Sequence, residues 1–508
     1  MQTDVVPETL WPRLSEFIAE HIGLHFPPER RPDLQRALTA VAAEFGFASS
    51  ARCADWLLSS PLTRPQLHAL ASHLTVGETY FFRERQTFEA LAQHVLPELI
   101  RGRRGGEQRL RLWSAACSTG EEPYSLAILV QQLLPDWQDW RVTILATDIN
   151  ERFLQKAAAG VYGEWSFRGS PPGFKERYFT PTPDGRFAVA RHIQDRVSFA
   201  PMNLAQDHFP SLATDTNAMD LIFCRNLLIY FTPSHARKLV ENLHHALRDG
   251  AWLAVSPSEC SQALFSRFVA VNFPDSILYR KCNVEEQSPS TWTPASSPAV
   301  AERPASAFAA DAVPVEDVRA APAETSTDPA DPADPRTAAE SLYEQGRYAE
   351  AASVLLASFA SQAAQGPRAF SLLARALANQ GQLADALAWS ARWIAADKID
   401  SAAHYLHAMI LQEMGDREAA RRSLQRTIYL QPGFALAHFA LGNLTRAGSR
   451  GAQANKHFEN ALHLLRDRPP EELLPQSDGM TAGRLVEIIV TVLSLPHRSP
   501  SSSEGGAQ

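Results

Sequence analysis

Apolar residues at helical spacing dominate the first hundred residues of the chain. Trp11, Leu14 and Ile18 follow one another at intervals of three or four, and a second run with the same spacing begins at Leu34. A period of about 3.6 residues gathers such side chains on one face of a helix. We therefore predict a helical N-terminal domain over residues 1–100.

Beyond residue 100 the pattern changes to short apolar runs that are separated by helical ones. Runs typical of buried strands occupy residues 109–115, 141–146, 220–224 and 250–255. Helical patterns follow the first three of these runs, over residues 123–134, 151–159 and 234–248. Strands that alternate with helices indicate an α/β fold with a parallel sheet, which we expect over residues 101–282.

A small insertion interrupts this alternation at about residues 161–200. Glycines and prolines surround two short strand patterns in this segment, at residues 187–191 and 197–200. Such residues mark turns between short elements. We therefore expect a small β-subdomain that contains both strands.

Composition changes sharply at residues 283–336, where Pro, Ala, Ser, Asp and Glu dominate and large apolar residues are almost absent. Such a segment cannot bury enough apolar surface to offset the entropy cost of folding. It is predicted to be a disordered linker that is extended where proline is dense.

After this linker, glycines recur about every 34 residues, at Gly346, Gly381, Gly415 and Gly448. Each lies in a turn between two helical patterns, and small residues such as Ala351 recur in the second helix. This period and this helix–turn–helix unit are typical of tetratricopeptide (TPR) repeats, which we predict over residues 337–466. Residues 467–508 are predicted to form a capping helix, at 481–495, and a disordered tail.

Length and composition limit the classes of protein to which the chain can belong. At 508 residues it exceeds the size that one core usually organises, so several domains are expected. The net charge of −8 gives no support for a nucleic-acid binder. Five cysteines without a C-x-x-C pair argue against a disulfide framework or a zinc site. Because no signal peptide or membrane-spanning run is apparent, we expect a cytoplasmic protein.

The first predicted strand of the α/β region runs into a glycine-containing turn, ACSTGEE, at residues 116–122. A strand, a tight turn and a helix form a nucleotide-type site in which the chain approaches its ligand closely. The turn lacks Gly-Lys-Ser/Thr, which excludes a P-loop. Glu121 and Glu122 would repel a pyrophosphate at the helix N-terminus and suit a cationic ligand such as S-adenosylmethionine. Complementarity with the helix dipole would by itself explain one such glutamate.

Asp148 ends the second predicted strand of the α/β region. In Rossmann-like sites an acidic residue at this point holds the ribose hydroxyls of the ligand. An aspartate after a strand also serves as a helix cap. The argument for a ligand therefore depends on Asp148 occurring together with the glycine-containing turn.

Four motifs, in order, resemble those of the CheR family of chemoreceptor methyltransferases: TVGETYFFRE, LWSAACSTGEEPYSLAI, ATDIN and FCRNLLIYF. The resemblance covers roughly residues 10–282. It implies a helical N-terminal domain and a Rossmann-like α/β methyltransferase domain with a small β-subdomain, to which the sequence adds an all-α TPR domain. It also implies S-adenosylmethionine as the methyl donor and glutamate side chains of a bacterial receptor as the acceptors.

Carried over residue by residue, the resemblance implies donor contacts by Thr79, Arg83, Glu121, Glu122, Asp148, Asn203, Leu204, Arg225 and Asn226. Arg83 and Tyr230 match the pair thought to flank the reacting group. The asparagine that the family has two residues before the threonine of the first motif is Gly77 here, so that contact is missing. Whether Arg83 holds the donor or the substrate stays open, as does the choice between Glu121 and Glu122.

The implied chemistry needs little acid–base help, because a glutamate carboxylate is already a nucleophile towards a sulfonium methyl group. Alignment and exclusion of water are the tasks left to the protein. A strongly apolar site would raise the pKa of the acceptor glutamate and protonate it, which Arg83 could offset. The sequence has no D/N-P-P-Y/F motif, which argues against methylation of amino groups on bases or glutamine.

Arg30, Arg31 and Arg36 lie on or before one predicted N-terminal helix. A solvated helix face is the simplest explanation, but in the family the matching helix resembles the element that meets the acidic helix bundle of the receptor. The segment 178–186 is short and has one glycine, whereas members that dock on a receptor pentapeptide carry a longer, glycine-rich loop there. We therefore expect docking without a pentapeptide tether, steered by the arginines.

The TPR array is expected to be a regulatory or localising module with a protein partner that the sequence does not identify. Because the linker at 283–336 is loose, the array should be free to move. A chain that ends near residue 283 is accordingly expected to methylate its receptor.

Three functions stay open at this stage. The first is the receptor methyltransferase. Its TPR array makes it more similar to the enzymes of alternative chemosensory systems, such as the Wsp surface-sensing system, than to the short flagellar enzymes. The second is a methyltransferase that uses the same donor on another protein or on a small molecule. The third is a TPR scaffold whose degenerate catalytic domain only senses S-adenosylmethionine. Intact motif side chains, apart from Gly77, speak against the third.

Overall fold

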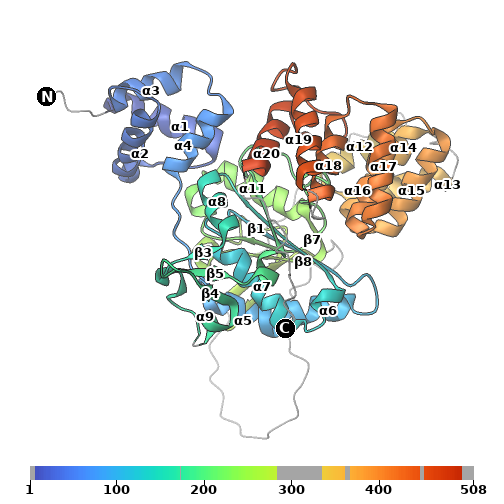
Figure 1. Cartoon of the computed structure of the whole chain (residues 1–508), viewed down its shortest axis with the longest axis horizontal. Helices are drawn as coiled ribbons and strands as arrows, with labels where there is room; N and C mark the ends of the chain where they lie inside the picture. The colour runs from blue at the N-terminus through green and yellow to red at the C-terminus, as the bar shows by residue number, and fades with distance from the viewer. Residues whose placement is uncertain (1–5, 172, 283–334, 361–365, 447–450, 495–508) are drawn as a thin grey trace, which may run out of the picture.

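The computed structural model describes residues 6–171, 173–282, 335–360, 366–446 and 451–494. A cluster of N-terminal helices, a central α/β domain and a C-terminal row of helices lie next to one another (Figure 1). Nearly all of the predicted linker at 283–336 and the predicted tail beyond 494 lie outside the described residues. Among the helices that the structure describes, none combines the length and apolar character needed to cross a bilayer.

The N-terminal helices pack around the apolar stripes that the sequence predicted, with Leu14, Ile18 and Leu34 fully buried. Their bounds are α1 Trp11–Ile22, α2 Arg31–Glu44, α3 Ser50–Ser59 and α4 Arg64–Leu74. A loop then leads to a second helical stretch that lies against the central sheet: α5 Arg85–Ala90, a π-helical segment Leu91–Val95 and α6 Leu96–Arg103.

Gly23 shows how closely the N-terminal helices meet the α/β domain. It ends α1 in the left-handed region at φ 87°, and a Cβ there would lie 2.5 Å from the Phe231 ring. Only glycine satisfies both conditions without strain. The next residue, Leu24, forms a β-bridge with Phe231, so the first helix is tied to the loop that follows the sheet's central strand.

The central sheet has seven strands in the order β6-β2-β1-β7-β8-β10-β9. The first five run parallel, and β10 and β9 add an antiparallel edge. The bounds are β1 Arg109–Ala115, β2 Arg141–Asp148, β6 Val197–Pro201, β7 Met219–Cys224, β8 Leu247–Ala254, β9 Val269–Phe273 and β10 Ser276–Arg280. This mostly parallel sheet confirms the predicted α/β class, although β9 and β10 were not foreseen.

Helices follow the parallel strands as the sequence predicted. They are α7 Glu121–Leu133, α8 Glu151–Ala159 and α11 Pro233–Ala246. Because each crossover leads to a parallel strand, the carboxyl ends of β1, β2, β6 and β7 meet at one edge of the sheet. The loops that leave this edge build the cavity described below.

The small β-subdomain differs from the prediction in one strand. Its three-stranded sheet contains β3 Val161–Tyr162, β4 Phe179–Pro181 and β5 Phe187–Val189, with the short helices α9 Phe174–Tyr178 and α10 Arg191–Gln194 beside it. The predicted strand at 197–200 is β6, which pairs with β2 in the central sheet. Its assignment to the subdomain was wrong, because a five-residue alternating pattern does not reveal which sheet a strand joins.

The C-terminal helices form consecutive antiparallel pairs, which confirms the TPR array. Their bounds are α12 Pro335–Glu344, α13 Tyr348–Ala360, α14 Pro367–Asn379, α15 Leu383–Ala396, α16 Ser401–Met414, α17 Arg417–Leu430, α18 Ala435–Arg446, α19 Gly451–Leu465 and α20 Ala482–Ser494. Gly346, Gly381 and Gly415 end the first helix of their pairs with φ values of 70°, 77° and 84°. Gly448 lies outside the described residues.

The array lies firmly against the α/β domain, so the expectation that it moves freely is wrong for this structure. Glu413 at the end of α16 lies 3.1 Å from Arg109 and 3.9 Å from Arg111, and all three side chains are buried. Gly415 packs on Arg141, whose Cδ would be 2.7 Å from an added Cβ. These pairs join residues about 300 positions apart, which no local pattern could reveal.

Candidate functional site

A cavity opens at the carboxyl edge of the central sheet, under the N-terminal helices. Its empty volume, which includes space open to solvent, is about 750 Å³. Its walls come from the turns after β1, β2, β6 and β7 and from the N-terminal domain. Among the predicted site residues, the lining includes Arg30, Asp148, Asn203, Leu204, Arg225, Asn226 and Tyr230.

The turn after β1 is held in a conformation that few residues adopt. Ala116 and Ser118 have φ values of 63° and 50°, and Gly120 has 95°. A Cβ on Gly120 would lie 2.7 Å from the Cβ of Ala157 and 2.8 Å from the hydroxyl of Tyr162. Left-handed backbone at non-glycine residues is costly and is typical of ligand sites. The turn after β1 can therefore bring its backbone close to a bound ligand.

Asp148 lies at the end of β2 and is almost fully buried. Its two oxygens accept hydrogen bonds from the amide nitrogens of Ser118 and Asn150, both at 2.8 Å. Burial raises the pKa of this carboxyl to about 6, although these bonds oppose the shift. The carboxylate can accept a further hydrogen bond, and among the described residues the buried hydroxyl of Ser118 in the wall has no partner. The Asp148 carboxylate, with the Ser118 hydroxyl beside it, fits the two neighbouring hydroxyls of a ribose.

Arg225 lies at the centre of a buried charge cluster at the cavity wall. Its guanidinium is 3.2 Å from Glu122 and 2.9 Å from Glu84, and it donates to the carbonyl of Arg83 at 2.5 Å. Glu122 also accepts from Ser114 at 2.7 Å. One guanidinium thus faces two carboxylates, which leaves negative charge beside the cavity. Such a wall favours a cationic ligand group.

Tyr230 and Arg30 close the cavity from the side of the N-terminal helices. The guanidinium of Arg30 lies 5.0 Å from the centre of the Tyr230 ring and 4.7 Å from that of Phe26. In the described residues the Tyr230 hydroxyl makes no hydrogen bond within the protein. A phenol and a guanidinium, both partly exposed, can therefore meet an anionic group that enters from solvent.

Residues 77–274 match the protein family described as "CheR methyltransferase, SAM binding domain". The "Chemotaxis protein methyltransferase 2" of Vibrio cholerae is 32% identical over 281 residues, which cover 55% of this chain and 96% of the relative. The chain belongs to the CheR methyltransferase family.

Other relatives extend this comparison. The "Chemotaxis protein methyltransferase 1" of Pseudomonas aeruginosa is 39% identical over 211 residues, 41% of this chain and 74% of its own length. The "Probable biofilm formation methyltransferase WspC" of the same species is 30% identical over 393 residues, 76% of this chain and 84% of its own length. Among solved structures, MamA matches 26% of the chain and 78% of its own length at a TM-score of 0.25 and 21% identity.

Of the two neighbouring glutamates in this CheR-type domain, Glu122 lies nearer to the cavity. Glu121 is buried, and its two oxygens accept from the hydroxyls of Thr119 at 2.6 Å and Ser166 at 2.9 Å. It therefore ties the turn to the β-subdomain. Glu122 instead contacts Arg225, which lines the cavity. Burial raises the pKa of Glu122, and Arg225 opposes that shift.

Glu122→Gln is expected to weaken S-adenosylmethionine binding about tenfold, because it removes negative charge beside the ligand and leaves Arg225 less compensated. Glu121→Gln is the matched control and should keep donor affinity near wild type while lowering thermal stability. Calorimetric titration of both variants measures the effect. Equal losses of affinity would contradict the assignment of Glu122.

Thr79 and Arg83 of the CheR-type first motif stay outside the cavity wall in this structure. They lie in the loop between α4 and α5, which Phe81 anchors among the buried rings of the β-subdomain. The guanidinium of Arg83 donates to the carbonyl of Glu78 at 2.5 Å. The carbonyl of Arg83 accepts from Arg225, and the charge of the Arg83 guanidinium helps to lower the pKa of Glu122 in the same cluster. Direct donor contacts by these two side chains therefore stay predictions from the resemblance.

Phe153 explains why the family's asparagine is replaced by Gly77. A Cβ at position 77 would lie 2.8 Å from the Phe153 ring, and that ring lines the cavity. An aromatic wall thus occupies the space that the asparagine would need. Phe153, Ser118 and the cavity position of Arg30 were not foreseen, since an apolar residue in a helix and a serine in a turn carry no distinguishing signal.

The three N-terminal arginines have different surroundings. Arg30 faces the cavity and its Nε lies 3.6 Å from Asp33, Arg31 pairs with Glu8 at 2.7 Å, and Arg36 pairs with the same Asp33 on the surface. Exposed pairs of this kind contribute little to stability and leave the charges accessible. Arg31 and Arg36 remain available to an acidic partner, while Arg30 belongs to the cavity.

Proposed function

We propose that the protein transfers the methyl group of S-adenosylmethionine to glutamate side chains on the cytoplasmic domain of a bacterial chemoreceptor. The observation that carries this proposal is the charge pattern of the cavity. Asp148 lines the inner wall beside Arg225, whose guanidinium contacts Glu84 and Glu122 behind that wall, whereas Arg30 lies beside Tyr230 on the partly exposed side. A cationic donor fits the first region and an anionic acceptor fits the second.

In the proposed donor complex, Asp148 would hold the ribose of S-adenosylmethionine, and the Arg225–Glu122 pair would border its methionine part. Asn203 and Leu204 would border the adenine, opposite the Phe153 ring. Bound S-adenosylmethionine supplies an electrophilic methyl group. The protein's task is to orient that group and to keep water away from it.

For the acceptor, Arg30 and Tyr230 would receive the glutamate carboxylate. A guanidinium within reach keeps the carboxylate ionised and fixes its plane. The carboxylate oxygen forms a bond to the methyl carbon while the methyl–sulfur bond breaks, which gives a methyl ester and a neutral thioether. No proton moves in this step, so the site needs no general base.

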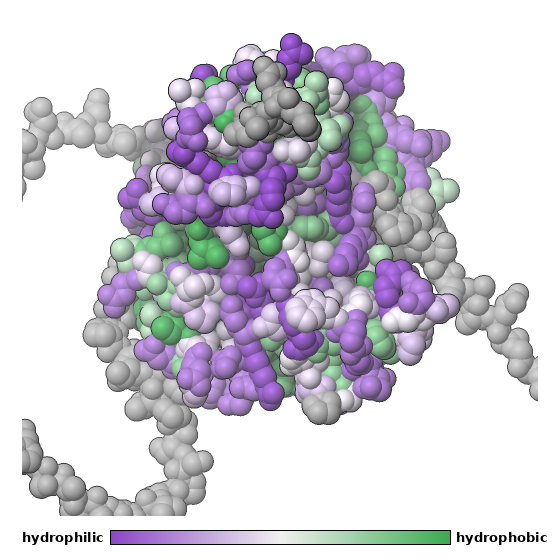
Figure 2. Space-filling model, turned by 90° about the vertical axis from the view of Figure 1, so that its left-hand side faces the viewer, coloured by the Kyte–Doolittle hydropathy of each residue, from purple (hydrophilic) through white to green (hydrophobic). Residues whose placement is uncertain are grey.

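A protein acceptor is favoured over a metabolite because apolar side chains are exposed around the cavity. Val76 lines the cavity and is 63% exposed, and Ile229, next to Tyr230, is 51% exposed. On the face drawn in Figure 2, hydrophobic residues gather in small groups within a mainly hydrophilic surface. We take these two exposed apolar residues beside the cavity as support for a macromolecular acceptor.

Docking is proposed to need no receptor pentapeptide. The β4–β5 connection closes tightly, since Thr182 donates to the carbonyl of Arg186 at 2.8 Å and Gly185 has a φ of 75°. Such a short turn offers little backbone to an added strand. Arg31 and Arg36 would steer the acidic receptor instead.

The TPR array is proposed to bind a protein partner in a surface-sensing system within the cytoplasm. The support is the alignment with WspC, whose 393 aligned residues extend beyond the methyltransferase domain. A wide hollow between the array and the α/β domain is lined by charges of both signs, among them Arg368, Arg375, Glu344 and Asp400.

The proposal is tested by incubating the full chain with radiolabelled S-adenosylmethionine and candidate receptor cytoplasmic domains, with and without their last residues. Base-labile label on the receptor, in equal amounts for both receptor forms, supports the proposal. Label on small molecules would identify a metabolite enzyme, and donor binding without transfer would identify a donor sensor. Loss of labelling with the shortened receptor would overturn tether-free docking.

Tyr230→Phe is expected to lower turnover about tenfold while donor affinity stays near wild type, because the hydroxyl acts on the acceptor during transfer. Methyl transfer at saturating donor and calorimetric titration measure the two quantities. Tyr429→Phe is the matched control, since this exposed tyrosine lies on α17 of the array, outside the described cavity lining. Unchanged turnover in Tyr230→Phe would remove this residue from the active centre.

A further inference from the structure

The turn that follows β6 forms one wall of the donor cavity. Met202, Asn203 and Leu204 line the cavity, and the amide of Met202 donates to the carbonyl of Asp148 at 3.0 Å. Pro201, the last residue of β6, is the register partner of Asp148 in the sheet. The position of this turn therefore decides where the proposed ribose and adenine contacts lie relative to each other.

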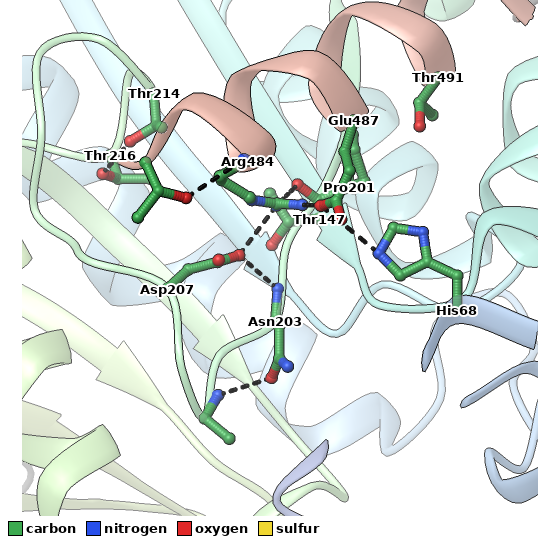
Figure 3. A network of polar contacts seen from close by, with 12 residues as sticks. His68, Thr147, Pro201, Asn203, Asp207, Thr214, Thr216, Arg484, Glu487 and Thr491 are labelled. Atoms are coloured by element: carbon green, nitrogen blue, oxygen red, sulfur yellow. Dashed lines mark hydrogen bonds and ion pairs between the residues drawn. The ribbon is translucent and has the colours of Figure 1, made fainter. Parts of the chain in front are cut away.

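The other side of the same turn is held by the last helix of the C-terminal array (Figure 3). Arg484 on α20 donates to the carbonyl of Pro201 and lies 2.8 Å from the carboxylate of Asp207. Asp207 in turn accepts from the amide of Asn203 at 2.6 Å. The Arg484 guanidinium thus contacts both ends of the turn from Pro201 to Asp207.

Arg484 is well suited to this role because it is buried and fully engaged. Its side chain is 8% exposed, and its third acceptor is the carboxylate of Glu487, at 2.8 Å on the same helix. Burial alone would lower the pKa of this guanidinium, but Asp207 and Glu487 raise it. A planar guanidinium can serve three acceptors at once, whereas a lysine ammonium reaches fewer of them in fixed directions.

The N-terminal domain meets α20 at the same place. His68 of α4 lies 2.9 Å from Glu151 at the start of α8 and 3.6 Å from Glu487. Thr491 of α20 donates to the same Glu151 at 2.7 Å. The last helix therefore fits between the N-terminal helices and the α/β domain, behind the cavity wall.

We propose that Arg484 is a positioning residue for the donor cavity, which it sets by fixing the Pro201–Asp207 turn from the array side. Full donor affinity then requires the C-terminal array, although the array adds no residue to the described cavity wall. The inference rests on the proposed function, in that it takes S-adenosylmethionine as the ligand of the cavity.

The test uses the full chain and three variants. Arg484→Ala removes the contacts, and Arg484→Lys keeps the charge. Glu413→Gln is the matched control, because it breaks the other buried ion pairs between array and α/β domain at the amino end of β1, away from the cavity. Each protein is titrated calorimetrically with S-adenosylhomocysteine, and KM for the donor and kcat are measured separately.

Arg484→Ala is expected to weaken S-adenosylhomocysteine binding and raise the donor KM about tenfold, with kcat at saturating donor little changed. Arg484→Lys should recover part of the affinity. Glu413→Gln should lose thermal stability but keep donor affinity. Hydrogen exchange of the amides at 202–207 should rise in Arg484→Ala only.

Two results would overturn the inference. Donor affinity equal to wild type in Arg484→Ala would show that the turn holds its shape without the array. Equal losses in Arg484→Ala and Glu413→Gln would show that the array only stabilises the fold. If the wild-type chain itself fails to bind S-adenosylhomocysteine, the proposed function fails instead, so the two failures are distinguishable.

Discussion

Replacing Arg225 with methionine is expected to lower the free energy of unfolding by about 3–5 kcal/mol, which is the typical loss when one partner of a buried ion pair is removed. The Arg225 side chain is 1% exposed and balances the carboxylates of Glu84 and Glu122. Without the guanidinium, the two carboxylates, whose side chains are 23% and 15% exposed, lose the cation that contacts both of them. Urea unfolding followed by far-UV circular dichroism measures the loss.

Two further variants show whether the loss comes from uncompensated charge. Arg225→Met combined with Glu84→Gln should recover part of the stability, because one of the two carboxylates is then neutral. Arg85→Met removes a neighbouring but exposed pair with Glu89 and should cost less than about 1 kcal/mol. Similar losses for Arg225→Met and Arg85→Met would contradict the buried cluster.

Asp148→Asn is expected to weaken donor binding about a hundredfold, because two charge-assisted hydrogen bonds to the ribose would be lost. The wild-type affinity should also fall as the pH drops below about 6, where this carboxyl becomes protonated. The variant should show no such pH step. Calorimetric titration between pH 5 and pH 8 measures both effects, with Asp136→Asn on the surface as the control.

The free energy of unfolding of the ligand-free protein should fall as the pH rises, whereas the donor affinity should increase. The pKa of Asp148 is raised from 3.8 to about 6, so the folded state binds more protons than the unfolded state between these values. Its contribution therefore makes the protein less stable as the pH rises through this range. An unfavourable buried carboxylate that becomes useful when a ligand binds is typical of a functional site. A pH-independent donor affinity in the wild type would exclude Asp148 from the ribose site.

The sequence predicted those parts of the site that depend on local order along the chain. Asp148 ends a buried strand and Arg225 directly follows another, and parallel strands present such residues at one edge. The tight turn at Gly120 could be read in the same way. Local patterns of this kind predict where the residues lie in the fold, because the strand, its turn and its helix form one structural unit.

The remaining parts depend on contacts between residues far apart in the chain. Arg484 reaches Pro201 across 283 positions, and Arg30 meets Tyr230 only because α1 and α2 cover the cavity. The strand β6 has the same alternating pattern as a strand of the small subdomain. Composition predicted a linker, nearly all of which lies outside the described residues. It could not show that the array docks on the catalytic domain, because ion pairs such as Arg109–Glu413 leave no trace in either local sequence.

The contact between α20 and the turn after β6 has a consequence for any protein that binds the TPR array. If binding to the array displaces Arg484 from Asp207, the donor affinity must change by some factor. Thermodynamic reciprocity then requires the donor to change the affinity for that partner by the same factor. Such a partner would distinguish donor-loaded enzyme from empty enzyme, and its occupancy would follow the supply of S-adenosylmethionine as well as the state of the receptor.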